Sequence, residues 1–129
     1  MYYIDTSALM KLIVAERESE ALRRWLDGSI GRVFGSDLLR TEFLRAVRSS
    51  VPAREDAAQD ILGSMLLVRL TRGTFDHAAE SEPRALRSLD ALHLACALEF
   101  GDDLEGIVTY DDRLAEAARA NGVAALSPR

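Results

Sequence analysis

The chain has 129 residues, of which 48% are hydrophobic and 29% charged, and its formal net charge is −5. This length predicts one domain over residues 1–129 with a single core. No apolar run long enough to span a bilayer and no basic, apolar leader is present, so we expect no membrane association and a cytoplasmic protein. The negative charge argues against binding of nucleic acid through overall basicity.

The basic residues are almost all arginine. Only Lys11 among the 16 basic residues is a lysine. Arginine forks suit bidentate contact with phosphate, so a local arginine rim can coexist with an acidic centre. The single cysteine, Cys96, has no partner for an internal disulfide, and its place in an apolar helix predicts a buried, unreactive side chain.

Strands and helices are expected to alternate along the whole chain. In chain order we expect a strand at 2–4, helices at 6–15 and 18–27, a strand at 32–36, helices at 37–50 and 54–64, a strand at 66–70, helices at 75–80 and 88–100, a strand at 107–110, a helix at 111–121 and a strand at 123–126. Thr6 or Ser7 is expected to cap the first helix, and Ser36 or Asp37 the third. This order predicts an α/β protein with a mostly parallel sheet of about five strands, covered by helices on both faces.

Two acids directly follow predicted strands. Asp5 ends the first strand, and Asp111 follows the strand at 107–110. In an open parallel sheet, ligands bind beyond the carboxyl ends of the strands, where the strand order reverses. If these two strands are neighbours, both carboxylates open onto one crevice. The alternative for each acid taken singly is a helix N-terminal residue that the helix dipole favours.

Two further acids fall within apolar helical patterns. Glu42 stands in the apolar stripe of DLLRTEFLRAV, and Asp90 stands in LDALHLACAL. Both carboxylates should therefore lie near the core. The alternative for Asp90 is a first-turn acid behind a Ser88 cap, which leaves the other acids unexplained.

Four acids near an interior cannot all remain as bare charges, because neighbouring carboxylates raise one another's pKa until some take up protons. A divalent cation removes this conflict. The donors are hard oxygens without a His-rich or Cys-rich spacing, which favours Mg²⁺ or Mn²⁺ with several waters retained. The hydroxyls of Thr6, Ser7 and Thr109 are placed to hydrogen-bond a carboxylate or a metal water, although helix capping and strand propensity explain them equally well.

The two histidines are expected to be structural. His93 lies one turn after Asp90 and could be considered as a general base, but a lone histidine in an apolar helix is more often a hydrogen-bonded core residue. His77 belongs to no group of functional residues.

Four ordered blocks, YIDTSALMKL, SDLLRTEFLRA, LRSLDALHLACAL and VTYDDRLAEAA, resemble the PIN-domain ribonucleases and, more narrowly, the toxins of VapBC toxin-antitoxin pairs. The blocks span almost the whole chain. The resemblance implies a PIN-like, three-layer α/β/α fold and an acidic metal site on Asp5, Glu42, Asp90 and Asp111. The family's Thr-x-Asp spacing selects Asp111, which leaves Asp112 as a candidate outer ligand.

The resemblance also implies a function. It implies endonucleolytic cleavage of RNA, with Asp5, Asp90 and Asp111 holding the metal and Glu42 holding a metal water or a second ion. It further implies a homodimer and a small VapB-type antitoxin, whose tail lies along the active-site groove and presents a basic side chain to the acids.

Three other classes fit the sequence less well. A receiver-type signalling domain needs a late lysine and an acid after the third strand, but the chain has only Lys11 and reads LVRLTRG there. A catalytically silent binding module would be favoured if one of the four acids were replaced, and none is. A phosphatase with a DxD motif is excluded because residue 7 is Ser.

Overall fold

Five short strands form one sheet in the computed structural model, which describes residues 1–129. The strands are β1 (Tyr2–Ile4), β2 (Val33–Ser36), β3 (Leu66–Val68), β4 (Gly106–Val108) and β5 (Ala125–Leu126). Their order across the sheet is β3-β2-β1-β4-β5, and every neighbouring pair is parallel. The predicted parallel sheet of about five strands is confirmed.

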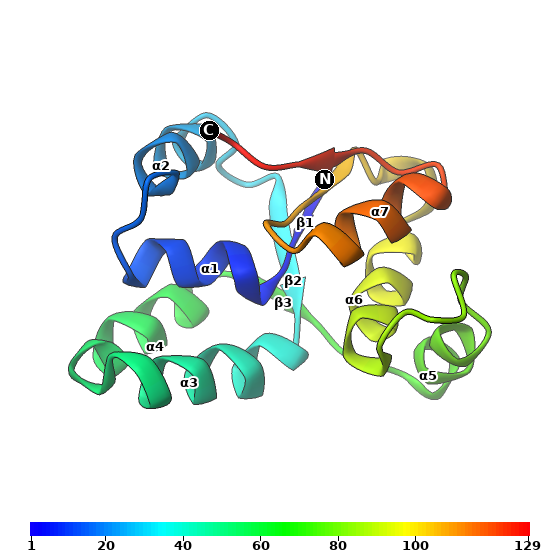
Figure 1. Cartoon of the computed structure of the whole chain (residues 1–129), viewed down its shortest axis with the longest axis horizontal. Helices are drawn as coiled ribbons and strands as arrows, with labels where there is room; N and C mark the ends of the chain where they lie inside the picture. Colours follow the sequence, from blue (N-terminus) through cyan, green and yellow to red (C-terminus); the bar gives the residue numbers. More distant parts are fainter.

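Helices cover both faces of the sheet (Figure 1). They are α1 (Thr6–Ile13), α2 (Ser19–Asp27), α3 (Leu38–Ser50), α4 (Glu55–Ser64), α5 (Arg72–Ala79), α6 (Ser88–Leu98) and α7 (Asp112–Ala120), with 3-10 turns at Pro52–Arg54 and Gly101–Asp103. Helices α1 to α4 lie on one side and α5 to α7 on the other. The three-layer α/β/α architecture is therefore confirmed. None of the helices combines the length and apolar composition needed to cross a bilayer.

The alternation of side chains along β1 divides the core in two. Ile4 packs with Leu9, Phe43 and other residues of the α1–α4 layer, whereas Tyr3 packs with Leu94 and other residues of the α6–α7 layer. Successive strand residues point to opposite faces of a sheet, so neighbours in the sequence enter different cores. Tyr3 and Ile4, although adjacent in the sequence, therefore belong to the cores on opposite faces of the sheet.

The strand order reverses between β1 and β4. The chain builds β2 and β3 on one side of β1 and then crosses over to place β4 on the other side. Ile4 is in register with Val108, and the Asp5 amide donates a hydrogen bond to the Val108 carbonyl oxygen at 3.2 Å. The loops after β1 and β4 therefore meet at the switch point, as the sequence predicts.

Some predicted element ends and caps are wrong. Asp5, rather than Thr6 or Ser7, caps α1. Asp37 stands at the N-cap position of α3 but makes no side-chain cap bond. Helix α5 begins at Arg72, earlier than expected, because Thr71 and Thr74 form a reciprocal capping box.

The structure also tests the predictions for Thr109 and Cys96. Strand β4 ends at Val108, so Thr109 lies in the loop that follows it and not in the strand. Cys96 is fully buried, as predicted, and burial raises the pKa of its thiol to about 11. A thiol with such a pKa is protonated at neutral pH and therefore unreactive.

Candidate active site

Four acids from four different elements surround the switch point. Asp5 follows β1, Glu42 lies on α3, Asp90 lies in the first turn of α6, and Asp111 is the N-cap residue of α7. The negative charges of Asp111, Asp5 and Glu42 all raise the pKa of the Asp90 carboxyl. The structure therefore brings together the four acids that the sequence singled out.

Asp5 is rigidly held. Its side chain is 5% exposed and accepts hydrogen bonds from Ser7 Oγ at 2.7 Å, the Ala8 amide at 3.1 Å and Thr109 Oγ1 at 2.7 Å. Burial raises the pKa of the Asp5 carboxyl, and these three hydrogen bonds oppose the rise. One carboxylate thus caps α1 and ties the loop after β1 to the loop after β4.

Two hydroxyls organise the loop after β4. Thr109 Oγ1, which donates to Asp5, accepts a hydrogen bond from the Asp111 amide at 3.0 Å. Ser7 Oγ accepts one from the Tyr110 amide at 2.9 Å. Ser7 and Thr109 therefore position the backbone that carries Asp111, which gives a structural reason for hydroxyl side chains at both positions.

Glu42 is anchored by a buried histidine. Its Oε1 lies 2.5 Å from His93 Nε2 and accepts a longer hydrogen bond of 3.3 Å from Thr6 Oγ1. His93 is 3% exposed, and its Nδ1 lies 2.6 Å from the Tyr3 hydroxyl, which is 2.9 Å from Ser36 Oγ. The predicted structural role of His93 agrees with these two hydrogen bonds.

The Glu42 carboxylate decides which nitrogen of His93 carries a proton in this series of hydrogen bonds. A carboxylate only accepts hydrogen bonds, so His93 Nε2 must carry the proton that faces Glu42. Oε2 of Glu42 makes no hydrogen bond within the protein. The sequence offered no signal for the Tyr3 and Ser36 contacts, because both residues lie on strands and reach His93 only through the fold.

Asp90 is the acid without a partner. It is half-buried, and no hydrogen bond supports its carboxylate. Burial raises the pKa of the Asp90 carboxyl most strongly, the Asp111 charge raises it further, and the His93 charge opposes the rise. Asp90 lies in the first turn of α6, as the alternative interpretation had it, but Ser88 is not the cap, because the N-cap residue is Arg87.

Asp111 and Asp112 have different surroundings. Oδ1 of Asp111 caps α7 by accepting hydrogen bonds from the amides of Arg113 at 2.9 Å and Leu114 at 3.0 Å. Its Oδ2 makes no hydrogen bond within the protein. Asp112 is exposed and makes none at all. Asp111, whose charge acts on Asp90, thus also caps α7.

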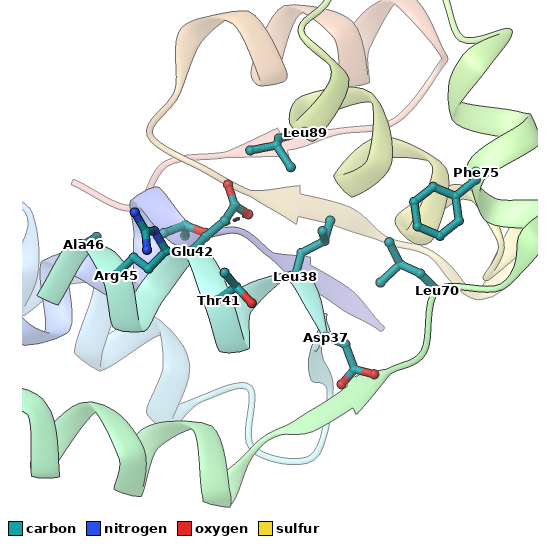
Figure 2. Close-up of a pocket in the computed structure, with 10 residues that line it drawn as sticks. Asp37, Leu38, Thr41, Glu42, Arg45, Ala46, Leu70, Phe75 and Leu89 are labelled. Atoms are coloured by element: carbon teal, nitrogen blue, oxygen red, sulfur yellow. Dashed lines mark hydrogen bonds between the residues drawn. The ribbon is translucent and has the colours of Figure 1, made fainter. Parts of the chain in front are cut away.

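A groove of about 860 Å³ runs from Glu42 along α3 toward α5. Figure 2 shows Glu42 and Arg45 near one end, and the apolar side chains of Leu38, Leu70 and Phe75 toward the other. Phe75 and Leu89, which also lines the groove, are 52% and 48% exposed. Such a large apolar surface beside an acidic centre is typical of a surface that binds another molecule.

The donor set fits a hard divalent cation. All candidate ligands are carboxylate or hydroxyl oxygens, which suit Mg²⁺ or Mn²⁺. No three His, Cys, Asp or Glu side chains are grouped closely enough to ligate one ion directly. Mg²⁺ commonly takes only one or two direct carboxylates and keeps several waters. The unpartnered carboxylate of Asp90 and the unbonded Oδ2 of Asp111 are the oxygens available to such an ion.

The fold and this arrangement of acids define a PIN domain, and the PIN domain family matches residues 2–120. Ribonuclease VapC46 of Mycobacterium tuberculosis is 41% identical over 126 residues, which cover 98% of this chain and 96% of the relative. Ribonuclease VapC35 of the same species is also 41% identical, with 99% and 97% covered. The chain therefore belongs to the PIN-domain family and, within it, to the VapC-type ribonuclease toxins, as the resemblance implied.

Solved structures agree on the fold. The sarcin-ricin loop cleaving toxin VapC20 of Mycobacterium tuberculosis superposes with a TM-score of 0.78 at 18% identity, covering 99% of this chain and 100% of that one. A toxin-antitoxin complex from Klebsiella pneumoniae gives a TM-score of 0.76 at 16% identity, with 100% and 98% covered.

Proposed function

We propose that the protein is an endoribonuclease that depends on Mg²⁺ or Mn²⁺ and acts as the toxin of a toxin-antitoxin pair. The observation that carries the proposal is the convergence of Asp5, Glu42, Asp90 and Asp111 at the switch point, with Asp90 left unpartnered. An unpaired, half-buried carboxylate among three others is unfavourable in the absence of a cation. The relatives named ribonuclease support RNA as the substrate.

Each acid has a distinct task in this proposal. Asp90 and Asp111 would contact the ion, Asp5 would hold it through a bound water, and Glu42 would hold a second water or a second ion, because no three of the acids are grouped closely enough to ligate one ion directly. When bound, the ion lowers the pKa of water and neutralises charge that develops on the phosphate. Asp5 is fixed by three hydrogen bonds, so it is already oriented before an ion binds. Asp111, held as the cap of α7, is oriented in the same way.

Glu42 is the candidate proton acceptor. His93 holds Oε1, so Oε2 is free to take a proton from the attacking water. As the water oxygen bonds to phosphorus, one bridging P–O bond of the RNA breaks and the leaving oxygen takes up a proton. Through its hydrogen bonds to Tyr3 and Glu42, His93 then acts as a positioning residue.

The apolar groove is the proposed binding surface for a small VapB-type antitoxin. Leu38, Leu70, Phe75 and Leu89 would receive apolar side chains of that partner, and Glu42 would accept a basic one. The structurally similar protein from Klebsiella pneumoniae was solved as a toxin-antitoxin complex, which supports a partner of this kind. Co-expression with the small reading frame next to the gene should yield a complex, and Phe75→Asp should weaken it. A complex unaffected by Phe75→Asp would refute this placement.

We also propose that the protein acts in the cytoplasm as a homodimer, because its RNA substrate is there and the family resemblance implies two copies. Light scattering on the purified protein tests the oligomeric state, and a monomer at micromolar concentration would contradict it.

The activity is tested directly by cleavage of a labelled, partly looped RNA by protein freed of any partner. We expect cleavage with Mg²⁺ or Mn²⁺ and none in excess EDTA. Asp5→Asn, Asp90→Asn and Glu42→Gln should each abolish cleavage while the fold is retained. Cleavage that persists in EDTA, or in all three variants, would refute the proposal and indicate a contaminating nuclease.

A further inference from the structure

Two arginines without an ion pair line one pocket, and each stands within three residues of a site acid in the sequence. Most arginines of the chain are committed elsewhere: Arg24, Arg32, Arg40, Arg48, Arg84 and Arg129 pair with acids, and Arg23 and Arg54 donate to carbonyl oxygens. Arg87 and Arg113 do neither, and both are exposed. Together with Pro83, Ala85, Leu86 and Glu116 they line a pocket of about 430 Å³.

The position of this pocket follows from the two helices that carry the acids. Arg87 is the N-cap residue of α6, three residues before Asp90, which corresponds to about 4.5 Å along the helix axis. Arg113 is the second residue of α7, and Asp111 is the N-cap residue of that helix. Arg87 and Arg113 line one pocket, so the starts of α6 and α7, which carry Asp90 and Asp111, also bring these two arginines together.

From this placement we propose that Arg87 and Arg113 form a phosphate-binding subsite for the RNA strand next to the cleaved bond, an inference that rests on the proposed ribonuclease function. An acidic centre repels a polyanion, and the chain as a whole carries a net charge of −5. Beyond the charge of the proposed metal ion, affinity for RNA must therefore come from local positive side chains of the protein. Guanidinium forks bind phosphate in a bidentate manner and are not needed here for stability.

Glu116 carries a negative charge in the same pocket, so its substitution should change RNA affinity in the direction opposite to that of the arginines. It lies one turn after Arg113 on α7, lines the same pocket and makes no ion pair with either arginine. A phosphate bound there would be repelled by this carboxylate. Glu116→Gln should therefore strengthen RNA binding, whereas loss of the arginines should weaken it. A role of these residues in folding alone would not produce opposite effects on RNA affinity.

The chain offers a matched control. Arg17 follows α1, and Arg119 lies in the last turn of α7; both helices begin at the site, so these exposed, unpaired arginines lie at the far ends. The double variants Arg87→Ala/Arg113→Ala and Arg17→Ala/Arg119→Ala remove the same charge. Neither removes an ion pair or a side-chain cap, so both should melt near the wild-type temperature.

The experiment measures binding of a labelled, unstructured RNA of about 20 nucleotides, by fluorescence anisotropy in Mg²⁺, in an Asp90→Asn background that cannot cleave it. Each phosphate contact to a single strand contributes about 0.7 to the slope of log K against log salt concentration. Loss of two contacts should lower the slope by about 1.4 and raise Kd roughly 20-fold at 0.1 M salt. The control double variant should change neither quantity.

Three outcomes of this experiment separate failure of the subsite from failure of the proposed ribonuclease function. If Arg87→Ala/Arg113→Ala weakens binding as stated and Glu116→Gln strengthens it, the subsite is supported. If that double variant behaves like the control, the subsite is refuted while the proposed ribonuclease stands. If the parent protein binds no RNA at any salt concentration, both the subsite and the proposed function are refuted.

Discussion

Substitution of His93 separates a structural role from the positioning of Glu42. The ring makes one hydrogen bond through each nitrogen, Nε2 to Glu42 at 2.5 Å and Nδ1 to Tyr3 at 2.6 Å. His93→Gln places an amide nitrogen near the position of Nε2 and keeps a donor for Glu42. His93→Asn places it near Nδ1 and keeps only the contact with Tyr3. His93→Leu removes both contacts.

The cost in stability follows from these two contacts. A hydrogen bond to a charged group contributes about 1.5–3 kcal/mol and a neutral one about 1 kcal/mol. His93→Leu should therefore lower the free energy of unfolding by about 2–4 kcal/mol, since the site is fully enclosed and Tyr3 retains Ser36 as a partner. For a chain of this size, each kcal/mol corresponds to roughly 4 °C in Tm. The two amide variants should fall between His93→Leu and the wild type.

Cleavage assays below the lowest Tm then test the positioning role. We expect His93→Gln to retain most of the wild-type kcat, and His93→Asn and His93→Leu to lose at least about tenfold, the scale found when a group supporting a metal site is removed. Equal activity of the Gln and Asn variants, at whatever stability, would refute the view that His93 acts through Glu42.

Two further predictions concern the other acids. In EDTA, Asp90→Asn should raise Tm at pH 7, because burial and the neighbouring acids raise the pKa of the folded-state carboxyl above its unfolded value. Ionised Asp90 therefore costs stability, so the advantage of the variant should shrink as the pH falls to the raised pKa and below; a lower Tm for Asp90→Asn at pH 7 would mean that the acid serves the fold. Asp111→Asn should keep the α7 cap and lose at least about tenfold in turnover and Mn²⁺ affinity, whereas Asp112→Asn should change activity little and cost at most about 1 kcal/mol. The reverse ranking of these two variants would move the metal site one residue along the chain.

Much of the fold could be predicted because local patterns and topology agree. Each observed strand lies within or next to a predicted apolar segment, and the alternation with helices leaves few arrangements other than a parallel sheet. The switch point then brings Asp5 and Asp111 together. At the start of α1 the sequence favours Thr6 or Ser7 as the cap, but the acid before them both caps α1 and belongs to the site.

The remaining features depend on tertiary contacts. Nothing near His93 in the sequence indicates Tyr3 or Ser36, which lie on β1 and β2 and meet the histidine only after the sheet has formed. The pocket between Arg87 and Arg113 likewise needs the packing of α6 beside α7. The spacing of residues along the sequence can place an acid on one face of a helix. It does not show which arginines form ion pairs, because those pairs depend on how the elements pack.

The most direct test of the metal site is Mn²⁺ binding in the absence of RNA, followed by electron paramagnetic resonance of the free ion. The wild type and Asp60→Asn, which alters an exposed acid of α4, should bind Mn²⁺ alike. Asp90→Asn should bind it at least about tenfold more weakly. Equal binding by all three proteins, or no binding by the wild type at millimolar Mn²⁺, would contradict the assignment of Asp5, Glu42, Asp90 and Asp111 as a metal site.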